Sequence, residues 1–321
     1  MKQLRVVLVV CGVLCGASAL QAADYPVRSI RYIVPQGAGG SSDTLARAVT
    51  QRLAESLGQQ VVVDNRPGAT GNIGAEIAAR AAPDGYTLLQ VATSHATNPA
   101  LGVKMPFDPV RDFAPITLLS QSPNLWIVHP SLPVKSVREL IVLAQSRPGE
   151  INYSSSGTGS SQHLAGELLK SSARIDIVHI PYKGSPPALL DLIGGRVMLM
   201  CSTIAPAMPQ VRTGKVRALA VTSLKRSPAA PEVPTVSESG LPGYEATAWQ
   251  GVLAPAGTPR EIVGKLNVEL VRIVQQPEVR KQLADQGYDP AGTTSDQFAE
   301  YVKTEIAKWS KVIKAAGLKA E

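Results

Sequence analysis

Two loops rich in glycine and serine carry the residue types best suited to hold an anion. They run from Pro35 to Asp43 and from Ser154 to His163, and each follows an apolar β-type run and precedes an amphipathic stretch. Glycine lets the backbone approach a ligand closely, and the first amides of the following helix have no acceptor within it. A tight turn with a good helix cap would explain either loop alone. Two such loops, one in each half of the chain, indicate a cleft that holds an anionic ligand from both sides.

The candidate ligand-binding residues come from these two loops and from the ends of other predicted strands. Segments 93–98, 182–184 and 201–203 each follow a predicted strand. Ligands of open α/β sheets bind outside the carboxyl ends of the strands, so these segments are expected to face the same cleft. The resulting set is Gln36, Gly39, Gly40, Ser41, Ser42, Asp43, Ser94, His95, Ser156, Gly157, Thr158, Gly159, Ser160, Gln162, Tyr182 and Ser202.

Known catalytic and metal-binding motifs are missing from the sequence. It has no G-x-S-x-G elbow, P-loop, H-E-x-x-H or paired-cysteine motif. Its four histidines lie far apart without ligand spacing, so we predict no metal site and no cofactor. Ser160 and His163 could form a nucleophile and base, which keeps a serine hydrolase as an alternative. At the start of a helix they more simply act as caps, and no orienting carboxylate is evident.

The N-terminus has the anatomy of a secretory signal peptide. Lys2 and Arg5 precede an apolar run at 6–14, and Ala17-Ser18-Ala19 matches the A-x-A cleavage pattern. The apolar run is shorter than the roughly 20 residues that a membrane-spanning helix needs. We therefore predict a cleaved signal peptide at residues 1–23, export, and a mature chain with one cysteine, Cys201, hence no internal disulfide. The unpaired cysteine is compatible with a bacterial periplasm.

The charge distribution argues against a nucleic-acid partner. The chain has 32 basic and 25 acidic residues, a formal net charge of +7. Nucleic-acid binders usually cluster lysine and arginine and interleave them with aromatic residues. Here the densest basic groups, Lys225-Arg226 and Arg280-Lys281, are short pairs beside turns, typical of a solvated surface. The small excess would favour the approach of anions.

Strand and helix patterns alternate along the chain, which predicts an α/β fold with parallel strands and crossover helices. The alternation restarts after Pro123, and the C-terminal block is almost entirely helical. A helical end needs a sheet to cover, and the simplest packing returns it to the first lobe. The predicted strands are 30–34, 61–63, 87–92, 125–128, 151–154, 175–180, 197–200, 216–222 and 249–253, and the predicted helices are 44–57, 75–82, 137–145, 164–171, 187–193, 260–275, 277–286 and 295–316.

These patterns divide the chain into two lobes. Lobe 1 is predicted to contain residues 24–122 and 247–321, and lobe 2 residues 123–246. The chain would then pass between the lobes twice, near 121–125 and near 244–249. Two such crossovers form a hinge.

Motifs along nearly all of the chain after residue 23 resemble the Bug-type periplasmic receptors of tripartite tricarboxylate transporters. They are spread over both predicted lobes, and together they are highly specific. The motifs are Tyr25-Pro26, the Gly-Gly-x-x-Asp loop ending at Asp43, DNRPG at 64–68, PDGYT at 83–87, DFAPI at 112–116, SSQHLAGE at 160–167, PYKG at 181–184, RALAVT at 217–222 and LAPAGTP at 253–259.

The resemblance implies a type II periplasmic binding-protein fold, in which two α/β lobes close on a ligand like a Venus flytrap. It implies that the loops at 39–43 and 156–162 capture a small carboxylate. It also implies a solute-binding receptor that is not an enzyme and that serves membrane transporter subunits, and we expect a monomer. A sensor that presents the same occupied lobes to a membrane kinase is the alternative.

Two positions depart from the family pattern and bear on the ligand. Gln36 stands where an aromatic or apolar residue is common, and Ser202 stands where many members carry an aspartate. An aspartate there is suited to pair with a ligand amine, and a buried ammonium without a carboxylate partner is costly. The sequence therefore predicts a dicarboxylate or an aromatic carboxylate in preference to an amino acid.

Overall fold

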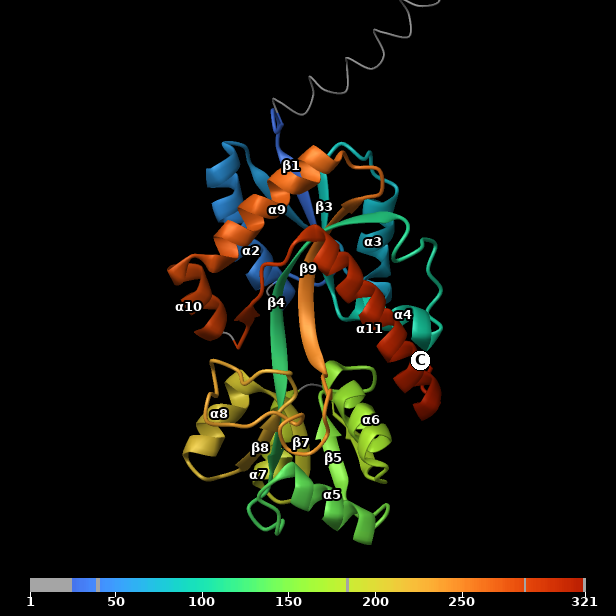
Figure 1. The fold of residues 1–321 in the computed structure, drawn as a ribbon, viewed down its shortest axis with the longest axis vertical. Helices are drawn as coiled ribbons and strands as arrows, with labels where there is room; N and C mark the ends of the chain where they lie inside the picture. The colour runs from blue at the N-terminus through green and yellow to red at the C-terminus, as the bar shows by residue number, and fades with distance from the viewer. Residues whose placement is uncertain (1–24, 39–40, 183–184, 286, 320–321) are drawn as a thin grey trace, which may run out of the picture.

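A computed structural model describes residues 25–38, 41–182, 185–285 and 287–319, which form two α/β lobes arranged along the long axis (Figure 1). Figure 1 shows the first and last parts of the described chain (blue, and orange to red) mainly in one lobe, lobe 1, and the middle of the chain (green to yellow) in the other, lobe 2. The signal peptide predicted at residues 1–23 lies outside the described residues. Within the described residues, no helix is long and apolar enough to cross a membrane.

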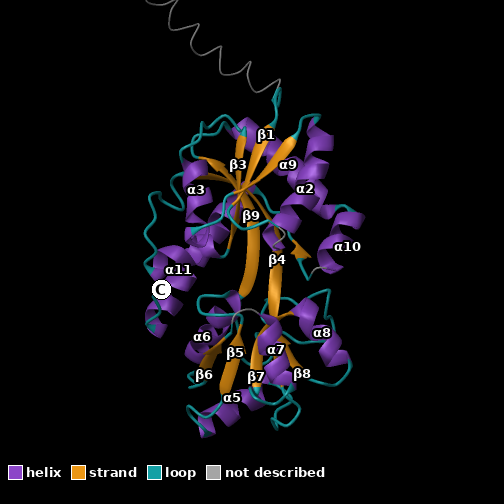
Figure 2. Ribbon diagram, turned by 180° about the vertical axis from the view of Figure 1, so that it is seen from behind, coloured by secondary structure: helices purple, strands orange, loops and turns teal. Residues whose placement is uncertain are grey.

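Lobe 1 is built on a mixed sheet with the strand order β2-β1-β3-β9-β4. The first three strands are parallel, and β9 runs antiparallel to both of its neighbours. Helices cover the sheet on both faces (Figure 2), which is why β1 is almost entirely buried and apolar. The elements are β1 (Ile30–Val34), α2 (Ser41–Leu57), β2 (Val61–Asn65), the short 3-10 helix η1 (Ala69–Gly71), α3 (Asn72–Ala79), β3 (Thr87–Ala92), α4 (Ser94–Leu101), β4 (Phe113–Val128), β9 (Thr247–Pro255), α9 (Arg260–Gln275), α10 (Pro277–Asp285), β10 (Asp289–Pro290) and α11 (Ser295–Ala316).

Lobe 2 has a smaller sheet that shares β4 with lobe 1. In it β7 runs parallel to β5, and β5 runs parallel to β6. The last residues of β4, Asn124–Val128, pair antiparallel with β7 on one side and β8 on the other. The elements are α5 (Val137–Ser146), β5 (Asn152–Ser155), α6 (Ser161–Ala173), β6 (Val178–Pro181), α7 (Ser185–Ile193), β7 (Leu199–Thr203), α8 (Ile204–Arg212) and β8 (Arg217–Val221).

Two long strands, β4 and β9, cross between the lobes (Figures 1 and 2). Up to Pro123, β4 pairs with β9, and from Asn124 it pairs with strands of lobe 2. Buried Asn124 joins both crossings, because its backbone N–H donates to Thr222 Oγ1 (2.8 Å) and its side-chain amide donates to Ala246 O (3.3 Å). The two-lobed fold with a hinge of two crossovers is therefore confirmed, while the division at 122/123 and 246/247 stays a prediction.

The C-terminal helix α11 begins at a capping box formed by Thr294 and Gln297 and ends at Gly317 in the left-handed conformation (φ 65°). Its buried face, with Phe298, Val302 and Trp309, packs on β4 and α4 of lobe 1. It also contacts α6 of lobe 2. The helix therefore lies alongside both lobes and does not only cover the sheet of lobe 1.

The predicted segments at 30–34, 87–92, 260–275 and 295–316 match β1, β3, α9 and α11 to the residue. The sequence reading missed α4, α8 and the first part of β4. Pro99 lies inside α4 and Pro209 inside α8, and prolines usually indicate a break in a helix. Pro115 and Pro123 interrupt the pattern of β4 in the same way.

Candidate functional site

A cavity of about 830 Å³ opens between the lobes, within the size range of small-molecule sites. Residues of both lobes and of the C-terminal tail line it. Lobe 1 contributes Gln36, Ser42, Thr70, Ala92, Thr93, Ser94, Thr97, Asn98, Leu101, Val103, Ser120, Ser122, Ala248, Trp249, Gln250 and Tyr288, lobe 2 contributes Thr158, Gly159, Ser160, Ser161, Gln162, Leu164 and Thr203, and the tail contributes Leu318 and Lys319.

The lobe 1 loop between β1 and α2 is held in place by a buried carboxylate. Asp43 accepts hydrogen bonds from Asn65 Nδ2 (3.0 Å) and from Arg47 Nε (2.9 Å). Asn65 Nδ2 also donates to the carbonyl oxygen of Gln36 (3.1 Å). Asp43 therefore fixes the ends of the loop and does not line the cleft. Ser42, in the first turn of α2, does line it.

A chain of hydrogen-bonded buried side chains lies behind the lobe 1 residues Ser42 and Gln250, which line the cleft. Gln90 Nε2 donates to Gln250 Oε1 (2.6 Å) and to Ser42 O (2.9 Å), and the Tyr32 hydroxyl donates to Gln90 Oε1 (3.0 Å). Because Gln250 Oε1 is an acceptor in this chain, its Nε2 is left to donate to a ligand. Gln250 therefore offers the cleft a donor whose orientation is fixed from behind.

The lobe 2 loop is ordered by its own serines. Ser160 is the N-cap of α6, where its Oγ accepts from the backbone N–H of His163 (3.2 Å) and donates to Gly157 O (2.7 Å). Ser156 Oγ donates to Gln162 Oε1 (2.7 Å). The amides of Ser161 and Gln162 open the helix and have no acceptor within it, so they are free to bind an anion at the cleft.

This geometry does not support a Ser160–His163 catalytic pair. The Ser160 hydroxyl bonds to main-chain groups of Gly157 and His163. The ring of His163 accepts from the Gly159 N–H at its Nδ1 (3.0 Å). The imidazole is therefore occupied with the loop backbone and is not placed as a base for the hydroxyl.

Some residues singled out in the sequence do not line the cleft because their side chains have other partners. The Nε2 of His95 lies 2.8 Å from Pro109 O, and burial lowers the pKa of His95 to about 4. The Tyr182 hydroxyl donates to Asp191 Oδ2 (2.8 Å). Ser202 is buried and donates to Thr203 O (3.1 Å), and the next residue, Thr203, lines the cleft in its place.

The sixteen residues proposed from the sequence thus separate into three groups. Those that line the cleft are Gln36, Ser42, Ser94, Thr158, Gly159, Ser160 and Gln162, and those that do not are Asp43, His95, Ser156, Gly157, Tyr182 and Ser202. Gly39, Gly40 and the side chain of Ser41 lie outside the described residues.

The sequence reading missed the polar residues of the crossing strands, Ser120 and Ser122 on β4 and Gln250 on β9. Strand residues at a hinge carry no local motif beyond spacings such as Ser-x-Ser at 120–122. The Oγ of Ser120 and the Oε1 of Gln36 are buried and have no hydrogen-bond partner among the described residues. Buried polar atoms are normally paired, so both are available to a ligand or to water.

The cleft combines neutral polar groups with apolar surface. Of the described residues that line it, only Lys319 has a charged side chain. Leu101, Val103, Leu164 and Leu318 add apolar area. No group of three or more metal-ligating side chains is found in the described part of the chain. The arrangement suits a carboxylate bound by N–H and O–H groups, and its described lining residues offer no acidic side chain to an amine.

Residues 45–318 match the model of the tripartite tricarboxylate transporter family receptor. The chain belongs to this family. Protein BugT of Bordetella pertussis is 38% identical over 305 residues, which cover 94% of each chain. A protein from the tcbD–tcbE intergenic region of Pseudomonas sp. strain P51 is 39% identical over 290 residues, covering 90% of this chain and 86% of that one.

Solved structures of similar receptors share the fold. Rpa4515 of R. palustris, solved with adipate, is 41% identical with a TM-score of 0.74 and covers 92% of this chain and 99% of its own. MatC of Rhodopseudomonas palustris, solved with bound malate, is 36% identical with a TM-score of 0.69 and covers 90% and 100%. A TctC solute-binding protein from Polaromonas, solved without ligand, is 31% identical with a TM-score of 0.84 and covers 91% and 99%. The periplasmic binding-protein fold and the resemblance to Bug receptors are thereby confirmed.

Proposed function

We propose that this receptor captures a small carboxylic acid that lacks an amine and delivers it to the membrane subunits of a tripartite tricarboxylate transporter. The observation that carries the proposal is the cleft itself, which is lined by Gln36 and Ser42 from the ends of the lobe 1 loop and by residues 158–162 of lobe 2, and has no acidic side chain among its described lining residues. Adipate and malate, bound to the two R. palustris proteins, are carboxylates of this class.

The ligand's carboxylate would be held by neutral donors. Backbone amides at the start of α6, with the positive end of the helix dipole, favour an anion without a fixed counter-charge. Gln250 Nε2 adds a donor from the opposite lobe. An ammonium in the same cleft would lose its water without gaining a carboxylate partner from the described lining residues. The argument against an amino acid ligand thus rests on the whole lining, because Ser202 itself is buried behind Thr203.

The apolar residues of the cleft would contact the part of the ligand that lies beyond its carboxylate. Leu101 and Val103 would cover methylene groups or a ring, and the almost fully buried Leu164 and Trp249 add to the apolar lining. Both a dicarboxylate with a methylene chain and an aromatic carboxylate satisfy this requirement.

We also infer that the lobes described here are in the open state and close on the ligand. The TM-score is 0.84 to the ligand-free Polaromonas protein, against 0.74 and 0.69 to the receptors with adipate and malate, although the ligand-free protein is less similar in sequence. Closure about β4 and β9 would bring the two loops onto one ligand. A decrease in the radius of gyration on ligand addition, measured by small-angle scattering, tests this.

Export to the periplasm through the predicted signal peptide completes the proposal. A receptor that collects a solute for a membrane transporter must meet that solute outside the inner membrane. Fractionation of cells that express the full chain should recover a processed protein in the periplasmic fraction. A full-length protein that stays in the cytoplasm would contradict the assignment.

The decisive experiment is calorimetry on the mature chain with a matched ligand panel. Succinate, malate, adipate and benzoate represent acids without an amine, and aspartate and glutamate carry one. We expect binding within the first group and weak or no binding in the second. Tighter binding of aspartate or glutamate would refute the argument that the described lining residues disfavour an amine. Hydrolysis of generic esters, measured in a separate assay, would favour the hydrolase alternative.

A further inference from the structure

Two histidine rings are stacked directly behind the lobe 2 loop. His163, on α6, and His179, on β6, have ring centroids 3.8 Å apart and planes within 10° of parallel. His163 is buried and His179 is partly buried. Neither ring lines the cleft, so the ligand-binding proposal leaves this pair without a role.

Each ring is connected to one glycine of the loop. His163 Nδ1 accepts the N–H of Gly159 (3.0 Å). His179 Nε2 lies 2.7 Å from Ser155 Oγ, and that hydroxyl accepts the N–H of Gly157 (3.1 Å). Both glycines have positive φ values, 134° for Gly157 and 76° for Gly159, in the region that side-chain-bearing residues rarely adopt. The histidine pair therefore holds the two points at which the loop backbone turns.

We propose that His163 and His179 are positioning residues of the ligand site. His163 binds the Gly159 amide directly, and His179 binds the Ser155 hydroxyl that accepts the Gly157 amide. Together they fix the loop so that the amides of Ser161 and Gln162 are presented to the carboxylate. This inference rests on the proposed function, because it assigns these amides to a carboxylate ligand.

The role requires His163 Nδ1 to be without a proton. The tautomer then has its proton on Nε2, which lies 3.8 Å from Glu167 Oε1. Glu167 also accepts from the Tyr153 hydroxyl (3.0 Å) and pairs with Lys170 (3.3 Å). Burial lowers the pKa of both histidines, that of His179 to about 4, so both rings are neutral at pH 7.

Side chains that mimic one ring nitrogen provide a sharp test. Asparagine can place an acceptor near the position of Nδ1, so His163→Asn should keep the bond to Gly159, whereas His163→Phe keeps the ring stack and loses the bond. Glutamine can reproduce Nε2, so His179→Gln and His179→Leu form the second pair. We expect adipate affinity to fall about three- to tenfold in the Phe and Leu variants, the effect of one hydrogen bond, and to stay within about twofold of wild type in the Asn and Gln variants. His129→Phe, on a histidine bonded to Ser131 away from the cleft, is the control.

Hydrogen exchange on the ligand-free protein separates this inference from the proposed function. The amide of Gly159 should exchange faster in His163→Phe than in wild type and in His163→Asn, whether or not a carboxylate binds. If wild type binds no carboxylate but exchange follows this pattern, the proposed function fails and the positioning of the loop stands. Unchanged exchange and affinity in His163→Phe, or equal losses in His163→Asn and His163→Phe, would overturn the inference. The His179 pair gives the same comparison if His163→Phe does not fold.

Discussion

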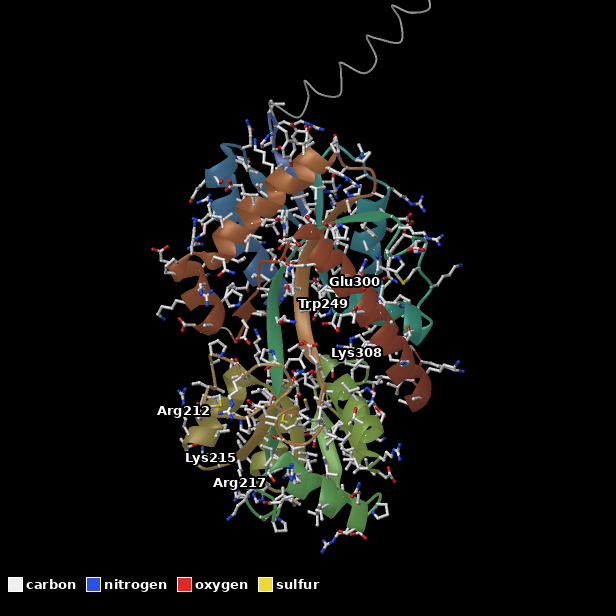
Figure 3. All side chains as sticks on the ribbon, viewed as in Figure 1. Arg212, Lys215, Arg217, Trp249, Glu300 and Lys308 are labelled. Atoms are coloured by element: carbon white, nitrogen blue, oxygen red, sulfur yellow. The ribbon has the colours of Figure 1, made fainter. Side chains whose placement is uncertain are left out.

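Trp249 donates its indole N–H to the carboxylate of Glu305 over 3.0 Å, which connects a strand of the cleft to the C-terminal helix. Glu305 is buried and also accepts from Trp309 Nε1 (2.9 Å) and forms an ion pair with Lys308. Lys308 in turn donates to Glu245 O (3.3 Å), on the chain segment that enters β9. Figure 3 shows Trp249 and Lys308 in the region between the lobes. The carboxylate of Glu305 thus fixes Trp249, which lines the cleft, where β9 crosses between the lobes.

Replacing Glu305 by alanine should destabilise the protein strongly. Two buried indole N–H groups and a largely buried lysine would lose their shared partner, and breaking such a buried pair costs about 3–5 kcal/mol. We expect a fall in Tm of roughly 10 °C, measured by thermal unfolding. Glu300→Ala is the matched control, because Glu300 lies on the same helix, is exposed, and forms its ion pair with Lys303 at a distance of 3.8 Å. Similar Tm losses in both variants would contradict the argument.

Stability should decrease in mild acid because of His95. Burial lowers the pKa of His95 to about 4 in the folded protein, whereas an unfolded histidine titrates near 6.5. The unfolded state therefore binds the proton first, and stability that is fully present above pH 6.5 is lost as the pH falls toward 4, by on the order of 3 kcal/mol. Glutamine can keep the hydrogen bond to Pro109 O without titrating. Urea unfolding of His95→Gln should show a smaller loss between pH 7 and pH 4.5 than wild type, and equal losses would exclude this role.

How far the sequence predicted the site depended on where each residue lies. Loops that join a strand to a helix have a local signature, and Ser160, Gln162 and Ser42 were found from it because capping and glycine content are encoded within a few residues. The crossing strands have no such signature. Ser120 and Gln250 reach the cleft only because β4 and β9 pair antiparallel over a long range, which the sequence does not encode locally.

The predicted site residues that do not line the cleft also show that local sequence patterns do not determine tertiary packing. His95 follows a strand as expected, but Phe107 and Phe113 pack against its ring and turn it into the core. Ser202 and Thr203 are adjacent in β7, and alternation along the strand puts one in the core and the next at the cleft. Which of the two faces the ligand depends on strand register, and a one-residue shift reverses the answer.

The lobe 2 loop should not tolerate a β-branched residue at Gly159. Its φ of 76° is costly for valine even though open space surrounds the missing Cβ, so the backbone would have to change conformation. The bond to His163 and the amides beyond it would move with it. We expect Gly159→Val to abolish adipate binding in calorimetry. Gly264→Ala, at an uncrowded position within α9, is the control and should leave affinity unchanged; unchanged affinity in Gly159→Val would show that this loop does not hold the carboxylate.

Lys319 should favour ligands with a second carboxylate. It is the single charged side chain among the described residues that line the cleft, and it follows Leu318, which lines the same cavity. An exposed ion pair contributes up to about 1 kcal/mol, so Lys319→Gln should weaken adipate binding about two- to fivefold. Hexanoate, which has the same carbon chain and one carboxylate, should bind the variant and wild type equally.

A control variant at Lys314 distinguishes a specific ion pair between Lys319 and the ligand from a general attraction of anions by basic residues. Lys314→Gln removes the same charge from the last turn of α11, at an exposed residue that does not line the cleft, and should leave the preference for adipate over hexanoate unchanged. Because an exposed pair is screened by salt, the preference in wild type should also shrink between low and physiological ionic strength. Equal weakening of adipate and hexanoate by Lys319→Gln would assign Lys319 to general steering of anions. No change for either ligand would leave a dicarboxylate without a charged partner among the described residues of this cleft and would favour an aromatic monocarboxylate as the natural ligand.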